Sequence, residues 1–128
     1  MAKILYIEDN ADNAYMLLRR LSRRGHDVEI AETGELGLVA AQRMRPDLII
    51  MDLILPEMDG WETTRRLKSE SLTQNIPVLA LSSSAMASDR SRALQVGCDD
   101  FDSKPVDMTR LLEKINKLLI TNSTLKHD

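Results

Sequence analysis

Short apolar runs alternate with segments of helical periodicity along the sequence, and this alternation constrains the fold more than any other feature. Apolar runs of four or five residues suit buried strands, whereas apolar residues that recur every three or four positions predict amphipathic helices. The predicted strands cover residues 4–7, 28–30, 48–51, 78–81 and 100–103. The run at 48–51 is apolar throughout, as in a parallel strand covered on both faces. The strand at 28–30 alternates with Glu29 and is expected at a sheet edge, and the one at 100–103 rests only on its place in the alternation.

A helix is predicted after each strand. Residues that begin or end helices stand at the expected boundaries: Gly25, Thr33, Asp59, Gly97 and Asp107. The second helix is expected to present Leu36, Val39 and Ala40 to the core. The third and fourth helices are expected near residues 61–68 and 86–96. The last helix carries the clearest apolar stripe, which consists of Met108, Leu111, Leu112, Ile115, Leu118 and Leu119.

Five βα units predict a doubly wound α/β fold, with a parallel five-stranded sheet between two layers of helices. Right-handed crossovers favour the strand order 2-1-3-4-5, so the predicted class is a flavodoxin-like (βα)5 three-layer sandwich. The 128 residues fit one domain. We assign residues 1–120 to that domain and expect residues 121–128 to form a frayed polar C-terminal tail.

Composition narrows the class of function. The single cysteine, Cys98, permits no intrachain disulfide and fits a reducing compartment. Acidic residues appear too early for a signal peptide, and no apolar run approaches the ~20 residues of a membrane span. The net charge of −3 weighs against a nucleic-acid partner. These features predict a cytoplasmic protein that binds neither membrane nor nucleic acid.

Polar residues follow four of the five predicted strands at the point where each strand ends. Glu8 and Asp9 follow the first strand, Asp52 the third, Ser82 the fourth and Lys104 the fifth. Because parallel strands share one carboxyl edge, where such sheets bind ligands, these groups are expected to meet there.

Three neighbouring carboxylates repel one another, and a hard divalent cation removes that conflict. Mg²⁺ takes oxygen ligands and binds through one or two carboxylates together with phosphate oxygens. Lysine supplies a compact positive charge for a phosphoryl group, and a carboxylate can form an aspartyl phosphate. The sequence therefore predicts that Asp52 carries a phosphoryl group beside bound magnesium.

At these residues the sequence resembles the receiver domain of two-component response regulators, in the single-domain form typical of chemotaxis regulators. The resemblance covers about residues 3–120, and its pieces are residues 4–9, 52–60, 77–82 and 97–105. It implies that Asp52 accepts a phosphoryl group from a partner phosphohistidine. It also implies that Asp9, Asp52 and the backbone carbonyl of Ile54 bind Mg²⁺, with Glu8 acting through a metal-bound water.

The resemblance assigns roles to residues of the last two strands as well. Lys104 would pair with the acceptor carboxylate and then with the phosphoryl group, to which Ser82 would donate a hydrogen bond. Ser82 and Phe101 would form the switch, with Phe101 turning inward as Ser82 moves. The peptide bond before Pro105 would be cis.

The same resemblance implies a signalling domain that catalyses only its own phosphoryl transfer and autodephosphorylation. The donor would be a histidine kinase or a histidine phosphotransfer protein. Arg19, Arg20, Arg23 and Arg24 either complement the helix dipole or help to dock that donor. Since no second domain is expected, output would pass to a protein partner in trans, from a monomer or a weak phosphorylation-dependent dimer.

Some residues depart from the common pattern of that family. Phe101 is often Tyr, so a switch here would rest on packing alone. Asp102 is unusual in a strand that is commonly apolar, and Ser83 stands where Ala or Gly is usual. Ile54 and Ser84 occupy variable positions that tend to set the phosphoryl lifetime.

Two other classes of function, an interaction module and a turnover enzyme, fit these residues less well. A pseudo-receiver that acts only as a protein interaction module would usually have lost the acceptor, an acid or the lysine. Phosphatases of the haloacid dehalogenase type need a second Asp two residues after the nucleophile, where this chain has Ile54. A dinucleotide enzyme would need a G-x-G-x-x-G motif after the first strand, which the chain lacks.

Overall fold

The structure is a computed structural model that describes residues 2–83 and 87–126. Strands and helices alternate along it as β1 (Lys3–Ile7), α1 (Ala11–Arg23), β2 (Asp27–Ala31), α2 (Gly34–Met44), β3 (Leu48–Asp52), α3 (Gly60–Ser69), β4 (Val78–Ser82), α4 (Ala87–Gln95), β5 (Asp100–Ser103) and α5 (Met108–Lys126). The predicted alternation is confirmed. Met86, the predicted first residue of the fourth helix, lies outside the described residues.

The strands form one parallel sheet in the order β2-β1-β3-β4-β5. The flavodoxin-like order is therefore confirmed, and β2 lies at an edge as its alternating sequence predicted. In β3 and β4 every residue is buried, which explains why these two strands read as nearly continuous apolar runs.

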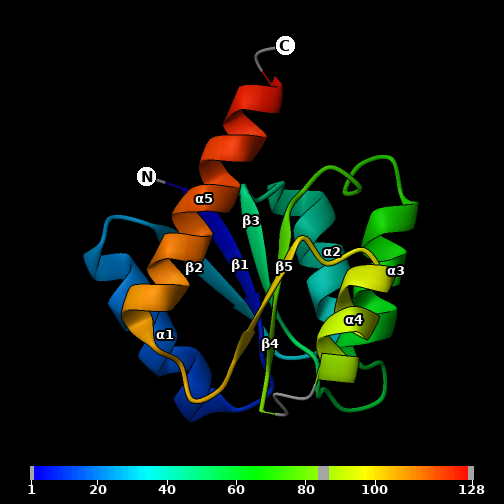
Figure 1. Cartoon of the computed structure of the whole chain (residues 1–128), viewed down its shortest axis with the longest axis horizontal. Coiled ribbons are helices and arrows are strands. Elements are labelled where there is room, and N and C mark those ends of the chain that lie inside the picture. The colour runs from blue at the N-terminus through cyan, green and yellow to red at the C-terminus, as the bar shows by residue number, and fades with distance from the viewer. Residues whose placement is uncertain (1, 84–86, 127–128) are drawn as a thin grey trace.

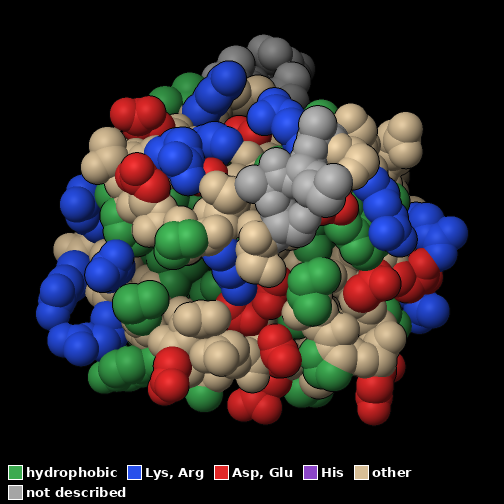
Figure 2. Space-filling view, turned by 60° about the horizontal axis from the view of Figure 1, so that its bottom comes forward, with side chains coloured by type: hydrophobic (Ala, Val, Ile, Leu, Met, Phe, Trp, Pro, Cys, Tyr) green, Lys and Arg blue, Asp and Glu red, His purple; other side chains and the backbone are tan. Residues whose placement is uncertain are grey.

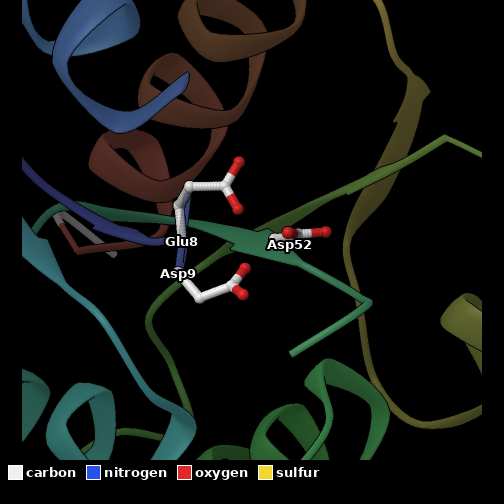
Figure 3. Close-up of side chains that lie close together, drawn as sticks. All are labelled: Glu8, Asp9 and Asp52. Carbon is white, nitrogen blue, oxygen red and sulfur yellow. The ribbon is translucent and has the colours of Figure 1, made fainter. Parts of the chain in front are cut away.

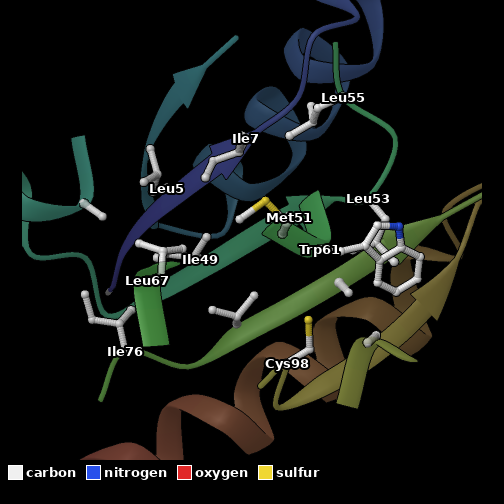
Figure 4. Close-up of a cluster of buried hydrophobic side chains, with 14 of the residues drawn as sticks. Leu5, Ile7, Ile49, Met51, Leu53, Leu55, Trp61, Leu67, Ile76 and Cys98 are labelled. Atoms are coloured by element: carbon white, nitrogen blue, oxygen red, sulfur yellow. The ribbon is translucent and has the colours of Figure 1, made fainter. Parts of the chain in front are cut away.

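Helices cover both faces of the sheet. In Figure 1, α1 and α5 lie on one side of the strands, and α2, α3 and α4 lie on the other. The core is divided accordingly. On the side of α2, α3 and α4 it includes Ile7, Met51, Trp61, Leu67 and Phe101 (Figure 4). On the side of α1 and α5 it includes Tyr6, Leu17, Leu21, Leu111 and Ile115.

Helix ends are fixed by side chains that the sequence largely identified. The side chains of Thr33, Asp59 and Asp107 accept hydrogen bonds from the backbone N–H three residues further on. Asn10 caps α1 in the same way. Gly25 and Gly97 follow α1 and α4 with positive φ angles of 89° and 110°, a conformation that glycine adopts readily.

The predicted buried face of α2 is wrong for two of its three residues. Leu36 and Val39 are 54% and 63% exposed, whereas Ala40 is buried as predicted. The helix instead packs through small residues, because a Cβ on Gly37 would lie 2.4 Å from Cδ1 of Ile7 in β1. The close approach of helix and strand turns the larger apolar side chains outward.

The last helix is longer than predicted. α5 continues to Lys126, so residues 121–126 are helical where the sequence predicted the start of a frayed tail. No Pro or Gly interrupts this segment, and the hydroxyl of Thr121 donates to the carbonyl of Lys117 (2.9 Å). The described helices include none that is long and apolar enough to cross a membrane.

Candidate functional site

The carboxyl ends of the strands bring the predicted polar residues to one edge of the sheet. Glu8 and Asp9 follow β1, Asp52 ends β3, Ser82 ends β4, and Lys104 follows β5. Backbone hydrogen bonds fix these ends to one another, since the N–H of Lys104 donates to the carbonyl of Ser82 (2.8 Å). Figure 2, which is turned toward this edge, shows acidic side chains gathered there.

Three carboxylates meet at this edge. Glu8, Asp9 and Asp52 each offer an oxygen atom, and these atoms lie within 4.8 Å of one another (Figure 3). Glu8 and Asp52 are buried, whereas Asp9 is exposed. The cluster therefore joins two desolvated carboxylates to one that solvent reaches.

Lys104 supplies the positive charge that faces these acids. Its Nζ donates to Oε1 of Glu8 at 2.6 Å and lies 3.4 Å from Oδ2 of Asp52. The backbone N–H of Ile54 donates to Oδ1 of Asp52 (3.1 Å). Both oxygens of Asp52 thus have a polar neighbour. The Lys104–Pro105 peptide bond is cis, as the resemblance implied.

Tyr6 is a polar contact of the site that the sequence interpretation did not identify. Its hydroxyl donates to Oε1 of Glu8 (3.1 Å), although the ring is buried in the core between the sheet and the α1–α5 layer. Burial and the Glu8 carboxylate raise the pKa of the Tyr6 phenol above its ordinary value, so the hydroxyl keeps its proton and donates. The sequence did carry a signal, because residues two apart in a strand share a face.

The acids shift one another's protonation. Burial raises the pKa of Asp52 to about 7, and the Glu8 carboxyl adds to this rise, while Lys104 and the Ile54 N–H oppose it. Burial also acts to raise the pKa of Glu8, but its interactions with Asp52, Lys104 and Tyr6 outweigh burial and hold this pKa below its ordinary value. Near neutral pH the Glu8–Asp52 pair therefore holds a proton that a divalent cation would displace.

These residues fit a hard divalent cation. Oε2 of Glu8 is buried and has no hydrogen-bond partner among the described residues, so the site leaves one desolvated oxygen for a ligand. The donor set consists of carboxylate oxygens, and nitrogen or sulfur ligands do not join the cluster in the described part of the chain. Oxygen ligands of this kind suit Mg²⁺.

The backbone of Asp52 is held by the start of α3. A Cβ on Gly60 would lie 2.4 Å from the carbonyl oxygen of Asp52 and 2.6 Å from Cα of Leu53. The N–H of Gly60 donates to the carbonyl of Leu53 (3.0 Å). Only glycine leaves room for this contact, which sets where β3 presents its last side chain.

The remaining predicted residues lie in varied surroundings. Ser82 and Phe101 are buried, and Phe101 points into the core beneath α3 and α4. The side chain of Ile54 is exposed, and so is that of Ser83, which lines the same cavity as Lys104. Ser84 lies outside the described residues.

Asp102, the unusual acid of β5, has a structural explanation. Its buried carboxylate accepts from Nε of Arg110 (2.8 Å), and Nζ of Lys114 lies 3.9 Å away. Nη2 of Arg110 also donates to the hydroxyl of Ser103 (3.3 Å). This ion pair joins β5 to the first turns of α5.

The strand order and the acidic cluster define a doubly wound α/β domain with its polar residues at the carboxyl edge of the sheet, where such sheets commonly bind ligands. The family model for the response regulator receiver domain matches residues 4–116. The chain belongs to this family, and the resemblance found in the sequence is confirmed.

Individual relatives agree with this assignment. The chain is 34% identical to the protein PilH of Pseudomonas aeruginosa, over 93% of this chain and 98% of PilH. The chemotaxis protein CheY4 of Vibrio cholerae has a similar structure, with a TM-score of 0.87 and 29% identity over 92% of this chain and 98% of that one.

A third relative was crystallised with a metal. The receiver domain of the sensor histidine kinase PA1611 from Pseudomonas aeruginosa has a TM-score of 0.85 and 30% identity, over 92% of this chain and 97% of that one. Its structure holds a magnesium ion in the active site cleft.

Proposed function

We propose that this chain acts as a stand-alone response regulator whose Asp52 accepts a phosphoryl group from a partner phosphohistidine, in a reaction that needs Mg²⁺. The observation that carries the proposal is the environment of Asp52. This buried carboxylate ends β3, lies within 4.8 Å of two further acids, and has Lys104 at 3.4 Å. A nucleophile of this kind needs its charge balanced in both the free and the phosphorylated state.

Phosphoryl transfer would proceed by displacement at phosphorus. A carboxylate oxygen of Asp52 attacks, an O–P bond forms, and the P–N bond of the donor imidazole breaks. The imidazole nitrogen keeps the electron pair of that bond. The product is an aspartyl phosphate, which water later hydrolyses back to the carboxylate and inorganic phosphate.

The chain's own residues would prepare this step. Asp9, Asp52 and the carbonyl of Ile54 would hold Mg²⁺, with Glu8 binding one of its waters. The metal would neutralise charge on the phosphoryl oxygens. Lys104 would leave the Asp52 carboxylate for a phosphoryl oxygen, and the hydroxyl of Ser82 would donate to another.

The donor would approach across α1. A cavity of about 330 Å³ opens between α1 and the loop after β5, and its lining includes Asn13, Met16, Arg20, Lys104 and Val106. Basic side chains gather on the side of the molecule where α1 lies (Figure 2), in accord with Arg19, Arg20, Arg23 and Arg24. An apolar hollow beside basic residues suits a helix of a histidine kinase or phosphotransfer protein with an apolar ridge and acidic flanks.

Output would pass through another face of the domain. Ser82 would move toward the phosphoryl group, and Phe101 would turn inward as Ser82 moves. The face formed by α4, β5 and α5 would then change its affinity for a protein partner. Phosphorylation can bias this equilibrium only by stabilising one of the two states more than the other.

Intact mass after incubation with acetyl phosphate tests the acceptor assignment. We expect a gain of one phosphoryl group that requires Mg²⁺ and is absent from Asp52→Asn. If folded wild-type protein gains no phosphoryl group even after rapid quenching in excess Mg²⁺, the acceptor role is refuted. The chain would then be an interaction module that never carries phosphate.

A further inference from the structure

Tyr6 contributes a polar atom to an otherwise apolar part of the core. It lies in β1, is 1% exposed, and packs with Leu17, Leu81 and Leu111 between the sheet and the α1–α5 layer. From there its hydroxyl reaches Oε1 of Glu8 at 3.1 Å. Packing alone would be served as well by phenylalanine, so the hydroxyl calls for an explanation of its own.

The two oxygens of Glu8 have different surroundings. Oε1 accepts from both Tyr6 (3.1 Å) and Lys104 (2.6 Å), whereas Oε2 is buried without a partner among the residues described. The carboxylate is itself only 1% exposed. Two donors on one oxygen therefore fix the orientation of the group and leave the other oxygen for a ligand.

We propose that Tyr6 is a positioning residue, whose hydroxyl holds Oε1 of Glu8 so that Oε2 is presented to the hydration shell of the divalent cation. This inference rests on the proposed function and adds a residue to it. Groups that orient a metal's partners commonly affect metal affinity even though they never touch the metal.

The same contact has a second consequence during phosphorylation. When Lys104 moves to the phosphoryl group, Glu8 loses its ion pair, and a buried carboxylate without a partner is costly. The Tyr6 hydroxyl stays in place, because the ring is fixed in the core. Glu8 then retains one donor while the lysine is engaged elsewhere.

The test is a titration of Mg²⁺ by calorimetry into the phosphate-free protein and its variants. Tyr6→Phe keeps the ring and removes only the hydroxyl. We expect it to weaken Mg²⁺ binding roughly tenfold, the lower end of the range for groups that orient a metal's partners. Tyr15→Phe is the matched control, because it removes the same atom from a tyrosine that is 61% exposed. Its Mg²⁺ affinity should equal that of wild type.

A double-mutant cycle separates positioning from a general effect on the fold. If Tyr6 acts through Glu8, the effect of Tyr6→Phe should disappear in a Glu8→Ala background. Circular dichroism of each variant verifies that it is folded. Unchanged Mg²⁺ affinity in Tyr6→Phe, or an equal loss with and without Glu8, would overturn the proposal.

The outcomes also distinguish this inference from the proposed function. If wild type binds Mg²⁺ but never takes a phosphoryl group, the acceptor role fails, while the titration still decides the role of Tyr6. If wild type binds no Mg²⁺, both fail.

Discussion

Asp52 lies between a carboxyl group that favours its protonated form and an ammonium group that favours its charged form. Burial is the largest cause of the rise in the pKa of Asp52, the Glu8 carboxyl adds to it and Lys104 opposes it, and the outcome is a pKa of about 7. The Asp52 carboxyl must be ionised to act as a nucleophile, and without a cation only part of the protein has it ionised near neutral pH. This balance makes the protonation of Asp52 measurable in two ways.

The affinity for Mg²⁺ should fall as the pH decreases. Below pH 7 the Glu8–Asp52 pair holds a proton that must leave before the metal binds, since the pKa of Asp52 is about 7. We expect affinity to be nearly constant above pH 8 and to fall by up to about tenfold for each pH unit below 7. Calorimetry in buffers of different ionisation enthalpy would also detect the released proton. An affinity that is constant from pH 6 to 8 would refute the shared proton.

Removal of the acceptor charge should stabilise the metal-free fold at neutral pH. A carboxyl whose pKa is raised on folding favours the native state while protonated, and this contribution is lost as the pH rises from about 4 through 7. Asp52→Asn has no carboxyl to ionise at this position, so its stability does not decrease in this way as the pH rises. We expect its free energy of unfolding at pH 7.5 without Mg²⁺ to exceed that of wild type by roughly 1–2 kcal/mol, because the lowered pKa of Glu8 offsets part of the effect.

Urea unfolding at pH 5 and pH 7.5 measures this difference. The gap between Asp52→Asn and wild type should narrow at the lower pH, where wild-type Asp52 carries its proton. A variant less stable than wild type at both values would contradict the assigned shift.

At the scale of residues, the polar groups at the strand ends could be predicted from the sequence, but the contacts between their side chains could not. Glu8, Asp52 and Lys104 could be predicted to meet, because parallel strands share a carboxyl edge. The bond from Tyr6 to Glu8 depends on side-chain orientation within a packed core. The two-residue period of a strand places Tyr6 and Glu8 on one face but does not show that their side chains meet, and Tyr6 was therefore interpreted only as part of a strand.

At the scale of elements, glycines set how closely two helices approach the sheet. Gly60 lets α3 begin against the backbone of Asp52, and Gly37 lets α2 pack on Ile7. The consequence for Leu36 and Val39 shows why the buried face of α2 was mispredicted. Hydrophobicity alone favours large residues inside, but a helix held this close to a strand has room only for Gly and Ala.

Gly60→Ala and Gly37→Ala should differ in effect although each adds one methyl group. The new Cβ at residue 60 would meet backbone atoms of Asp52 and Leu53, which cannot rotate away, whereas at residue 37 it would meet only side-chain atoms of Ile7. We expect Gly60→Ala to cost about 1–3 kcal/mol of stability and Gly37→Ala less, since alanine favours helices.

The rates of phosphorylation of these two variants distinguish them more clearly than their stabilities do. Displacement of the Asp52 backbone should slow Mg²⁺-dependent phosphorylation by acetyl phosphate in Gly60→Ala, while Gly37→Ala should react at nearly the wild-type rate. Equal rates in the two folded variants would show that the contact at Gly60 does not position Asp52.

At the scale of the whole molecule, α4 joins the end of β4 to α3, which lies in the same layer of helices. It follows the β4 strand that ends in Ser82, and its Arg92 lies over the ring of Trp61 in α3, with Cζ 4.5 Å from the ring centroid. Trp61 is the single tryptophan of the chain. Because its ring is nearly buried and touches α4 through one cation–π contact, its fluorescence should follow that helix.

Phosphorylation should therefore change the emission of Trp61. If Ser82 moves toward the phosphoryl group and α4 moves with it, the distance from Arg92 to the indole ring changes. We expect acetyl phosphate with Mg²⁺ to alter the emission of wild type but not of Asp52→Asn. In Arg92→Ala the starting spectrum should differ and the response should shrink, since the contact is already absent. A protein whose mass shows full phosphorylation but whose emission is unchanged would mean that α4 keeps its position, and the output would then have to arise from β5 and α5 alone.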